Sequence, residues 1–175
     1  MASRPAVRRP PQFSPGLMAW AGISSHGKSK LRWVEKGAKV NSDHYIKNVL
    51  TPFLKYDAIR LYPDGKFRFH KDSAPAHKAA STVKFLEDNR VNFIKEESWI
   101  PCSPDAAPMD SAIWGWMKNK LRYKKVKSLK GLKKAVQKIW SELPQELIDK
   151  ALASWPKRVH EIYKAKGHQI EQFRS

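Results

Sequence analysis

Two aspartates stand where a carboxylate can take part in chemistry. Asp72 follows Lys66–His70, whose alternating apolar and polar residues predict a strand. Asp110 lies in the first turn of a helix predicted to begin near Pro108. Ligands gather at the carboxyl ends of strands in open α/β sheets, so we expect Asp72 to face a cleft. A helix that packs inward can bring Asp110 to the same cleft.

Two such carboxylates suit metal-assisted cleavage of a phosphodiester. Mg²⁺ prefers hard oxygen ligands, and two ions about 3.5–4 Å apart can activate the nucleophile and stabilise the leaving oxygen. Each acid also has a purely structural interpretation. Asp72 can start a turn or cap a helix, and Asp110 or Asp105 can stabilise a helix N-terminus. The residues by themselves leave both interpretations open.

The charge distribution favours a polyanionic partner. The formal net charge is +18 over 175 residues, and no Asp or Glu occurs between Ser111 and Ser141. A solvated helical face usually mixes both signs, because like charges one turn apart destabilise a helix. The acid-free stretch therefore predicts a surface that faces phosphates. Its predicted nucleic-acid contacts are Lys118, Lys120, Arg122, Lys124, Lys125, Lys127, Lys130, Lys133 and Lys134, and Lys138 completes the basic set.

Several classes of protein do not fit the composition. The single cysteine, Cys102, excludes an internal disulfide and a cysteine-based zinc site, and no partner base for a catalytic thiol is evident. No apolar run approaches the roughly 20 residues that cross a membrane, and the basic start lacks the apolar core of a secretory signal. With 41% hydrophobic residues and seven tryptophans, we expect one folded domain.

The predicted elements alternate in type. The order of strands and helices predicts an α/β fold with a mixed sheet covered by helices. It matches a ribonuclease-H-like fold that lacks its first, central strand and has extra C-terminal helices. Pro52 is expected to kink or shorten the first helix, and Trp155-Pro156 to interrupt the last. The predicted strands are 17–23, 30–35, 66–70 and 91–94; the helices are 43–55, 76–89, one from about 108, 128–143 and 145–166; turns lie at 25–27 and 63–65, and a loop at 98–108.

Three segments resemble motifs of the mariner-type transposases. Leu17–Ser24, LMAWAGIS, is similar to their V-M-V-W-G-G-I-S strand and contains Trp20. Asp72–His77, DSAPAH, resembles the D-N-A-P-x-H motif around their second catalytic acid. Ser103–Asp110, SPDAAPMD, resembles the S-P-D-L-x-P-x-D/E motif around the third. The three motifs occur in the family's order, which makes the resemblance specific.

The resemblance extends from about Pro11 to the C-terminus and includes Trp155–Arg158, WPKR. The interval between the two acids is 37 residues (110 − 72 − 1), which with a final Asp is similar to the maT-like branch. This sequence departs from the family at Ser73, where the family usually has Asn, and at Ala106 and Ala107, where the family usually has Leu-Asn. These departures are compatible with metal binding.

The resemblance implies both chemistry and partners. Asp72 and Asp110 are then catalytic acids that bind Mg²⁺ or Mn²⁺, weakly if only two acids are present, and His77 and Trp20 support the motifs. The implied activity is DNA strand cleavage and transfer in transposition. The implied partner is DNA, bound mostly through its phosphate backbone, with a homodimer, a nuclear location, no membrane and no small-molecule substrate.

One feature of the family has no counterpart in this sequence. The family's first catalytic Asp lies on the first strand, upstream of the segment that matches Leu17–Ser24, and no acid precedes Glu35 here. Glu35, Asp43 and Asp57 are not expected to replace it. We therefore expect a transposase-derived protein that binds DNA but does not cut it; the alternative is a non-enzymatic, domesticated nucleic-acid-binding protein. The expected organisation is a lead-in over 1–16, a catalytic-type domain over 17–126 and a basic helical extension over 127–175.

Overall fold

The computed structural model describes residues 17–35, 37–95, 98 and 106–165. The lead-in predicted over 1–16 lies outside this range, and so do Cys102 and Asp105. Within the described part of the chain, no helix is long and apolar enough to span a membrane.

The strands predicted over 17–23 and 30–35 pair as a hairpin, but the pairing is divided into two short antiparallel ladders. They are separated at Gly22, whose N–H donates to Ser29 Oγ (2.8 Å) and whose carbonyl accepts from the Ser29 N–H (2.9 Å). The strand predicted over 17–23 was expected to be buried, but it is only partly so, since Met18 is 57% exposed. The ladders pair β1 (Ala19–Trp20) with β4 (Arg32–Trp33) and β2 (Ile23–Ser24) with β3 (Gly27–Lys28).

The first predicted helix begins as expected and continues beyond its predicted end. The Asn41 side chain accepts the His44 N–H (2.9 Å) and so caps the helix. Pro52 does not end it; instead the turns on both sides of this residue have π-helical winding, which accommodates a missing N–H. The helix extends past Lys55 because Ala58 and Leu61 are buried in the core. Its parts are α1 (Ser42–Tyr45), η1 (Ile46–Leu50), η2 (Phe53–Ala58) and α2 (Ile59–Leu61).

The strands predicted over 66–70 and 91–94 are extended segments joined by a single parallel bridge between Phe69 and Phe93. The Phe69 N–H donates to the Asn92 carbonyl (2.7 Å), and the Ile94 N–H donates to the Phe69 carbonyl (3.0 Å). The two predicted strands are therefore reduced to this single bridge. The helix between these segments is divided at Ala79, whose ψ of 139° is extended, into α3 (Pro75–Lys78) and α4 (Ala80–Asp88).

The C-terminal helices are confirmed close to their predicted bounds. Ser128 caps the second of them by accepting the Gly131 N–H (3.0 Å). The interruption expected at Trp155-Pro156 is absent, since the last helix continues through Pro156 to Lys164. The elements are η5 (Met109–Ile113), α5 (Trp114–Arg122), α6 (Leu129–Ser141) and α7 (Gln145–Lys164).

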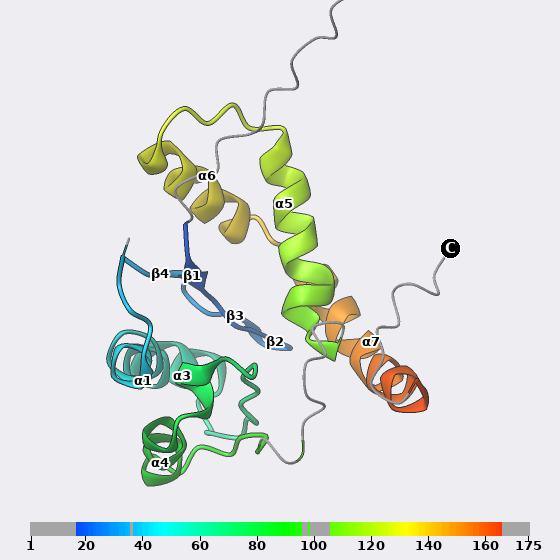
Figure 1. Cartoon of the computed structure of the whole chain (residues 1–175). Coiled ribbons are helices and arrows are strands. Elements are labelled where there is room, and N and C mark those ends of the chain that lie inside the picture. The colour runs from blue at the N-terminus through cyan, green and yellow to red at the C-terminus, as the bar shows by residue number, and fades with distance from the viewer. Residues whose placement is uncertain (1–16, 36, 96–97, 99–105, 166–175) are drawn as a thin grey trace, which may run out of the picture.

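Two buried clusters lie on opposite sides of the hairpin. Figure 1 shows the short strands between the group α1, α3 and α4 on one side and the group α5, α6 and α7 on the other. Trp140 connects α6 to the hairpin, because its Nε1–H donates to the Ser29 carbonyl (2.9 Å). The first cluster contains Leu31, Ile113, Met117, Ile139, Trp140, Leu143, Ile148 and Ala151, and the second contains Tyr45, Val49, Leu50, Phe53, Ala58, Phe69, Ala76 and Leu86.

Candidate functional site

Asp72 lies between the extended segment that ends at His70 and the start of α3. Its Oδ1 accepts the Ala74 N–H (3.0 Å), which closes a tight turn, and the same oxygen contacts His77 Nδ1. The hydrogen bond from His77 lowers the pKa of Asp72 more than partial burial raises it. Asp72 is therefore ionised at neutral pH, and its side chain is still 60% exposed.

His77 is held in place by the helix that precedes it in the chain. Its ring stacks on Tyr45, with the ring centroids 3.9 Å apart, and its side chain is only 12% exposed. Burial, followed by the nearby charge of Asp72, raises the pKa of Tyr45, so the phenol stays neutral. The role predicted for His77, as support for the Asp72 motif, stays a prediction. Trp20 packs against the same helix as His77, since the Trp20 ring meets the Phe53 ring edge-on with the centroids 5.5 Å apart.

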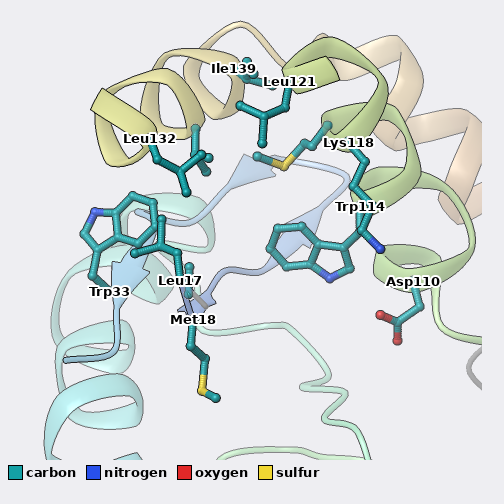
Figure 2. A pocket seen from close by; sticks show the side chains of 12 residues that line it. Leu17, Met18, Trp33, Asp110, Trp114, Lys118, Leu121, Leu132 and Ile139 are labelled. Carbon is teal, nitrogen blue, oxygen red and sulfur yellow. The ribbon is translucent and has the colours of Figure 1, made fainter. Parts of the chain in front are cut away.

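Asp110 approaches from the opposite side of the fold, in the first turn of η5. Burial is the largest cause of the raised pKa of Asp110, the charge of Asp72 raises this pKa further, and the charge of Lys118 lowers it. The influence of Asp72 means that the two carboxylates, 37 residues apart in sequence, interact through space. Figure 2 shows Asp110 and Lys118 beside an apolar pocket of about 480 Å³ that Trp114 and Leu121 also line.

Both acids face a second cavity of about 460 Å³, here called the groove. Residues 19–25 of the hairpin, residues 67–72 and residues 107–110 all line the groove. Asp72 and Asp110 are the only acidic residues that line the groove in the described part of the chain. No set of three or more His, Cys, Asp or Glu side chains among the described residues is arranged to bind a metal ion.

Two residues of this site carried no assigned role in the sequence analysis. Tyr45 occupies an apolar position of an amphipathic helix, a pattern that predicts only burial. Trp155 of α7 lines the groove, and its ring lies 5.8 Å from that of His70. Burial lowers the pKa of His70. The resemblance of Trp155–Arg158 to the family was the one signal that pointed to this region.

The predicted basic surface lies on α5, α6 and the loop between them. All of its predicted contacts are exposed except Lys133, which is half-buried with its Nζ 5.7 Å from the centroid of a Trp33 ring. Lys138 is 3.8 Å from Glu142, and it is the only member of the basic set with a salt bridge to a described residue. Lys118 joins this surface to the site, because it lines the same pocket as Asp110.

Asp57, which was not expected to replace the family's first acid, lies away from Asp72 and Asp110 in a buried ion-pair cluster. Asp57 is 1% exposed and binds Arg32, the Lys30 N–H (3.0 Å) and Arg60 (3.5 Å). It connects η2 to the hairpin and does not line the groove.

Comparison with known proteins gives relatives of one kind, although no family model matches the chain. The chain is 27% identical to the transposable element Tc3 transposase of Caenorhabditis elegans over 156 residues, 88% of this chain and 45% of the relative. It is 22% identical to the Tcb2 transposase of Caenorhabditis briggsae, over 86% of this chain and 52% of the relative. The chain thus spans about half the length of the curated relatives that it matches.

Solved structures with the same fold come from the Mos1 mariner transposase. The Mos1 paired-end complex with the left transposon end has a TM-score of 0.79 at 21% identity, over 96% of this chain and 48% of that one. The Mos1 catalytic domain has a TM-score of 0.72 at 19% identity, over 88% and 76%. The same domain with Raltegravir and Mg has a TM-score of 0.73 at 19% identity, over 88% and 77%. The predicted ribonuclease-H-like fold is confirmed.

Proposed function

We propose that this chain, a relative of the mariner-type transposases with the fold of their catalytic domain, supplies two acids of a divalent-metal site and a DNA-binding surface. The observation that carries the proposal is that Asp72 and Asp110, from different elements, face one groove and interact electrostatically. Carboxylates that come from different elements and line one cavity are the kind of ligand that metal-assisted phosphodiester cleavage uses.

The donor set fits Mg²⁺ or Mn²⁺. Both side chains are hard carboxylate ligands, and the charge of Asp72 contributes to the raised pKa of Asp110. Asp72 and Asp110 would hold a divalent cation, whose charge would offset that repulsion and which would supply Lewis-acid activation of water and phosphate. His77 keeps Asp72 ionised and oriented, and Tyr45 holds the His77 ring. The Mos1 catalytic domain, whose fold this chain shares, has been solved with Mg and with Mn.

The groove leaves room for a third carboxylate. The strands β1 and β2 and the segment around the bridged Phe69 both line the groove, so a strand placed between them can bond to their backbone groups. We propose that a segment in this position carries the third acid, either from the same polypeptide or from another molecule. The described residues then form an incomplete metal site that binds a cation weakly and does not cleave DNA without that segment.

The second part of the proposal is DNA binding through phosphates. The lysines of α5, the following loop and α6 are exposed except for the half-buried Lys133, and no acid between Ser111 and Ser141 offsets their charge. Such a surface gives affinity that falls steeply with salt and depends little on sequence. Because Lys118 lines the same pocket as Asp110, DNA on this surface passes close to Asp110. A nuclear location is consistent with this partner.

The test is a plasmid assay with the purified 175-residue chain and Mg²⁺ or Mn²⁺. We expect salt-sensitive binding to supercoiled plasmid, with no conversion to the nicked form. Nicking that requires metal and is lost in both Asp72→Asn and Asp110→Asn would show that the chain completes the site by itself, and would contradict the two-acid proposal. Absence of DNA binding at low salt would contradict the second part. Binding without nicking under every metal condition also fits the alternative, a non-enzymatic DNA-binding protein. A measurement of metal binding separates the two, because only the metal-site proposal expects Asp72 and Asp110 to bind an ion.

A further inference from the structure

Tyr123, at the C-terminal end of α5, is unusually exposed for an aromatic residue. Its side chain is 81% exposed, although burial of a tyrosine ring ordinarily stabilises a fold. Among the described residues, no ring or cation contacts it. Its neighbours Arg122, Lys124 and Lys125 are all exposed as well. The exposed Tyr123 ring therefore lies among the basic side chains of Arg122, Lys124 and Lys125.

Two other aromatic rings belong to the same surface and are already occupied by lysines. Lys120 Nζ lies 5.7 Å from the centroid of a Trp116 ring, and Lys133 Nζ lies 5.7 Å from that of Trp33. Both tryptophans are half-buried. Their rings help to position the ammonium groups, whereas no described lysine lies over the Tyr123 ring.

We propose that Tyr123 stacks on an unpaired base of single-stranded DNA whose phosphates lie on the neighbouring lysines. The inference rests on the proposed DNA-binding function and names a substrate class for it. Lysines alone bind duplex and single strands through the same phosphate charges. An aromatic ring adds affinity only where a base face is free, because the bases of a duplex are already stacked on each other. The bare ring within the basic surface thus favours an unpaired segment.

The chain contains a matched control. Tyr163 of α7 is 79% exposed, nearly as much as Tyr123, but it lies outside the acid-free stretch. The variants are Tyr123→Ala, Tyr123→Phe and Tyr163→Ala, and each changes an exposed side chain, so none is expected to unfold the protein. Fluorescence anisotropy measures the affinity of each variant for a labelled single strand of about 20 nucleotides, longer than one typical binding site, and for the corresponding duplex.

We expect Tyr123→Ala to weaken single-strand binding by about fivefold or more, the loss of one base–aromatic stack. Duplex affinity should change by less than about twofold, because no phosphate contact is lost. Tyr123→Phe keeps the ring and should bind like the wild type, as should Tyr163→Ala. The salt dependence of single-strand binding should also stay the same in Tyr123→Ala.

Several results would overturn the inference. These are an equal loss for single strand and duplex in Tyr123→Ala, an equal loss in Tyr163→Ala, or unchanged single-strand affinity in Tyr123→Ala. Unchanged affinity with salt-sensitive binding intact would reject the stacking role alone. A wild-type protein that binds neither form of DNA would reject the proposed DNA-binding function and the inference together.

Discussion

The loop between α5 and α6 offers a quantitative test of the basic surface. Lys124, Lys125 and Lys127 are exposed and lie outside helices, and none has a salt bridge to a described residue. Replacing all three with Gln removes three positive charges and leaves the buried clusters unchanged. We expect the variant to fold normally and to bind DNA with a weaker dependence on salt, because fewer counterions are released from the phosphates.

The magnitude follows from the number of contacts. Each phosphate neutralised on duplex DNA contributes about 0.9 to the slope of log affinity against log salt. If all three lysines contact phosphates, the slope becomes shallower by about 2.7. Between about 50 and 200 mM salt, a fourfold change, the fold loss of DNA affinity is then about 40 times smaller for the variant than for the wild type.

Fluorescence anisotropy over a salt series measures both slopes. The matched control replaces Lys39, Lys47 and Lys66 with Gln; all three are exposed, and they lie outside the acid-free stretch. This control has the same net charge as the loop variant. An equal change of slope in both triple variants would refute a localised surface and would attribute binding to the overall charge.

Three further predictions concern the fold and the site. Replacing the buried Asp57 with Ala leaves Arg32 without its partner and should cost about 3–5 kcal/mol of unfolding free energy in urea; a loss below about 1 kcal/mol would contradict its structural role. Trp140→Phe removes the bond to the Ser29 carbonyl, and thermal unfolding should show a loss of about 1–3 kcal/mol. Asp72→Asn should lower the pKa of Asp110, because a like charge is removed; carboxyl ¹³C NMR should then detect ionisation of Asp110 at lower pH, and an unchanged titration would show that the acids do not interact.

The elements that sequence reasoning predicted well are those that carry their own signals. Ser128 and Asn41 cap helices through their own side chains, so their helix starts were predictable. The extension of the first helix to Leu61 was not, because it depends on a core assembled from distant segments. The short pairing at Phe69 likewise depends on which strands lie beside it. Pro52 remains inside its helix because the turns beside it have π-helical winding, and Pro156 lies inside the continuous α7.

The site was predictable in part. The strand-end position of Asp72 and the helix-start position of Asp110 predicted that both acids face one cavity, and they do. The contact between Asp72 and His77 falls within one short motif, DSAPAH, and was accessible from the family resemblance. The stacking of Tyr45 on His77 was not, because an apolar position in a helix does not show which partner it packs against.

Metal binding at the two acids tests the central claim most directly. Titration of Mn²⁺ into the wild-type chain, Asp72→Asn, Asp110→Asn and a control, Asp64→Asn, measures whether both carboxylates bind one ion; Asp64 is an exposed acid of the turn at 63–65. We predict that each site variant weakens Mn²⁺ binding by at least about tenfold, because even the loss of a residue that only supports a metal ligand has an effect of this size. Asp64→Asn should bind Mn²⁺ like the wild type. Wild-type Mn²⁺ affinity in Asp110→Asn would contradict the central claim.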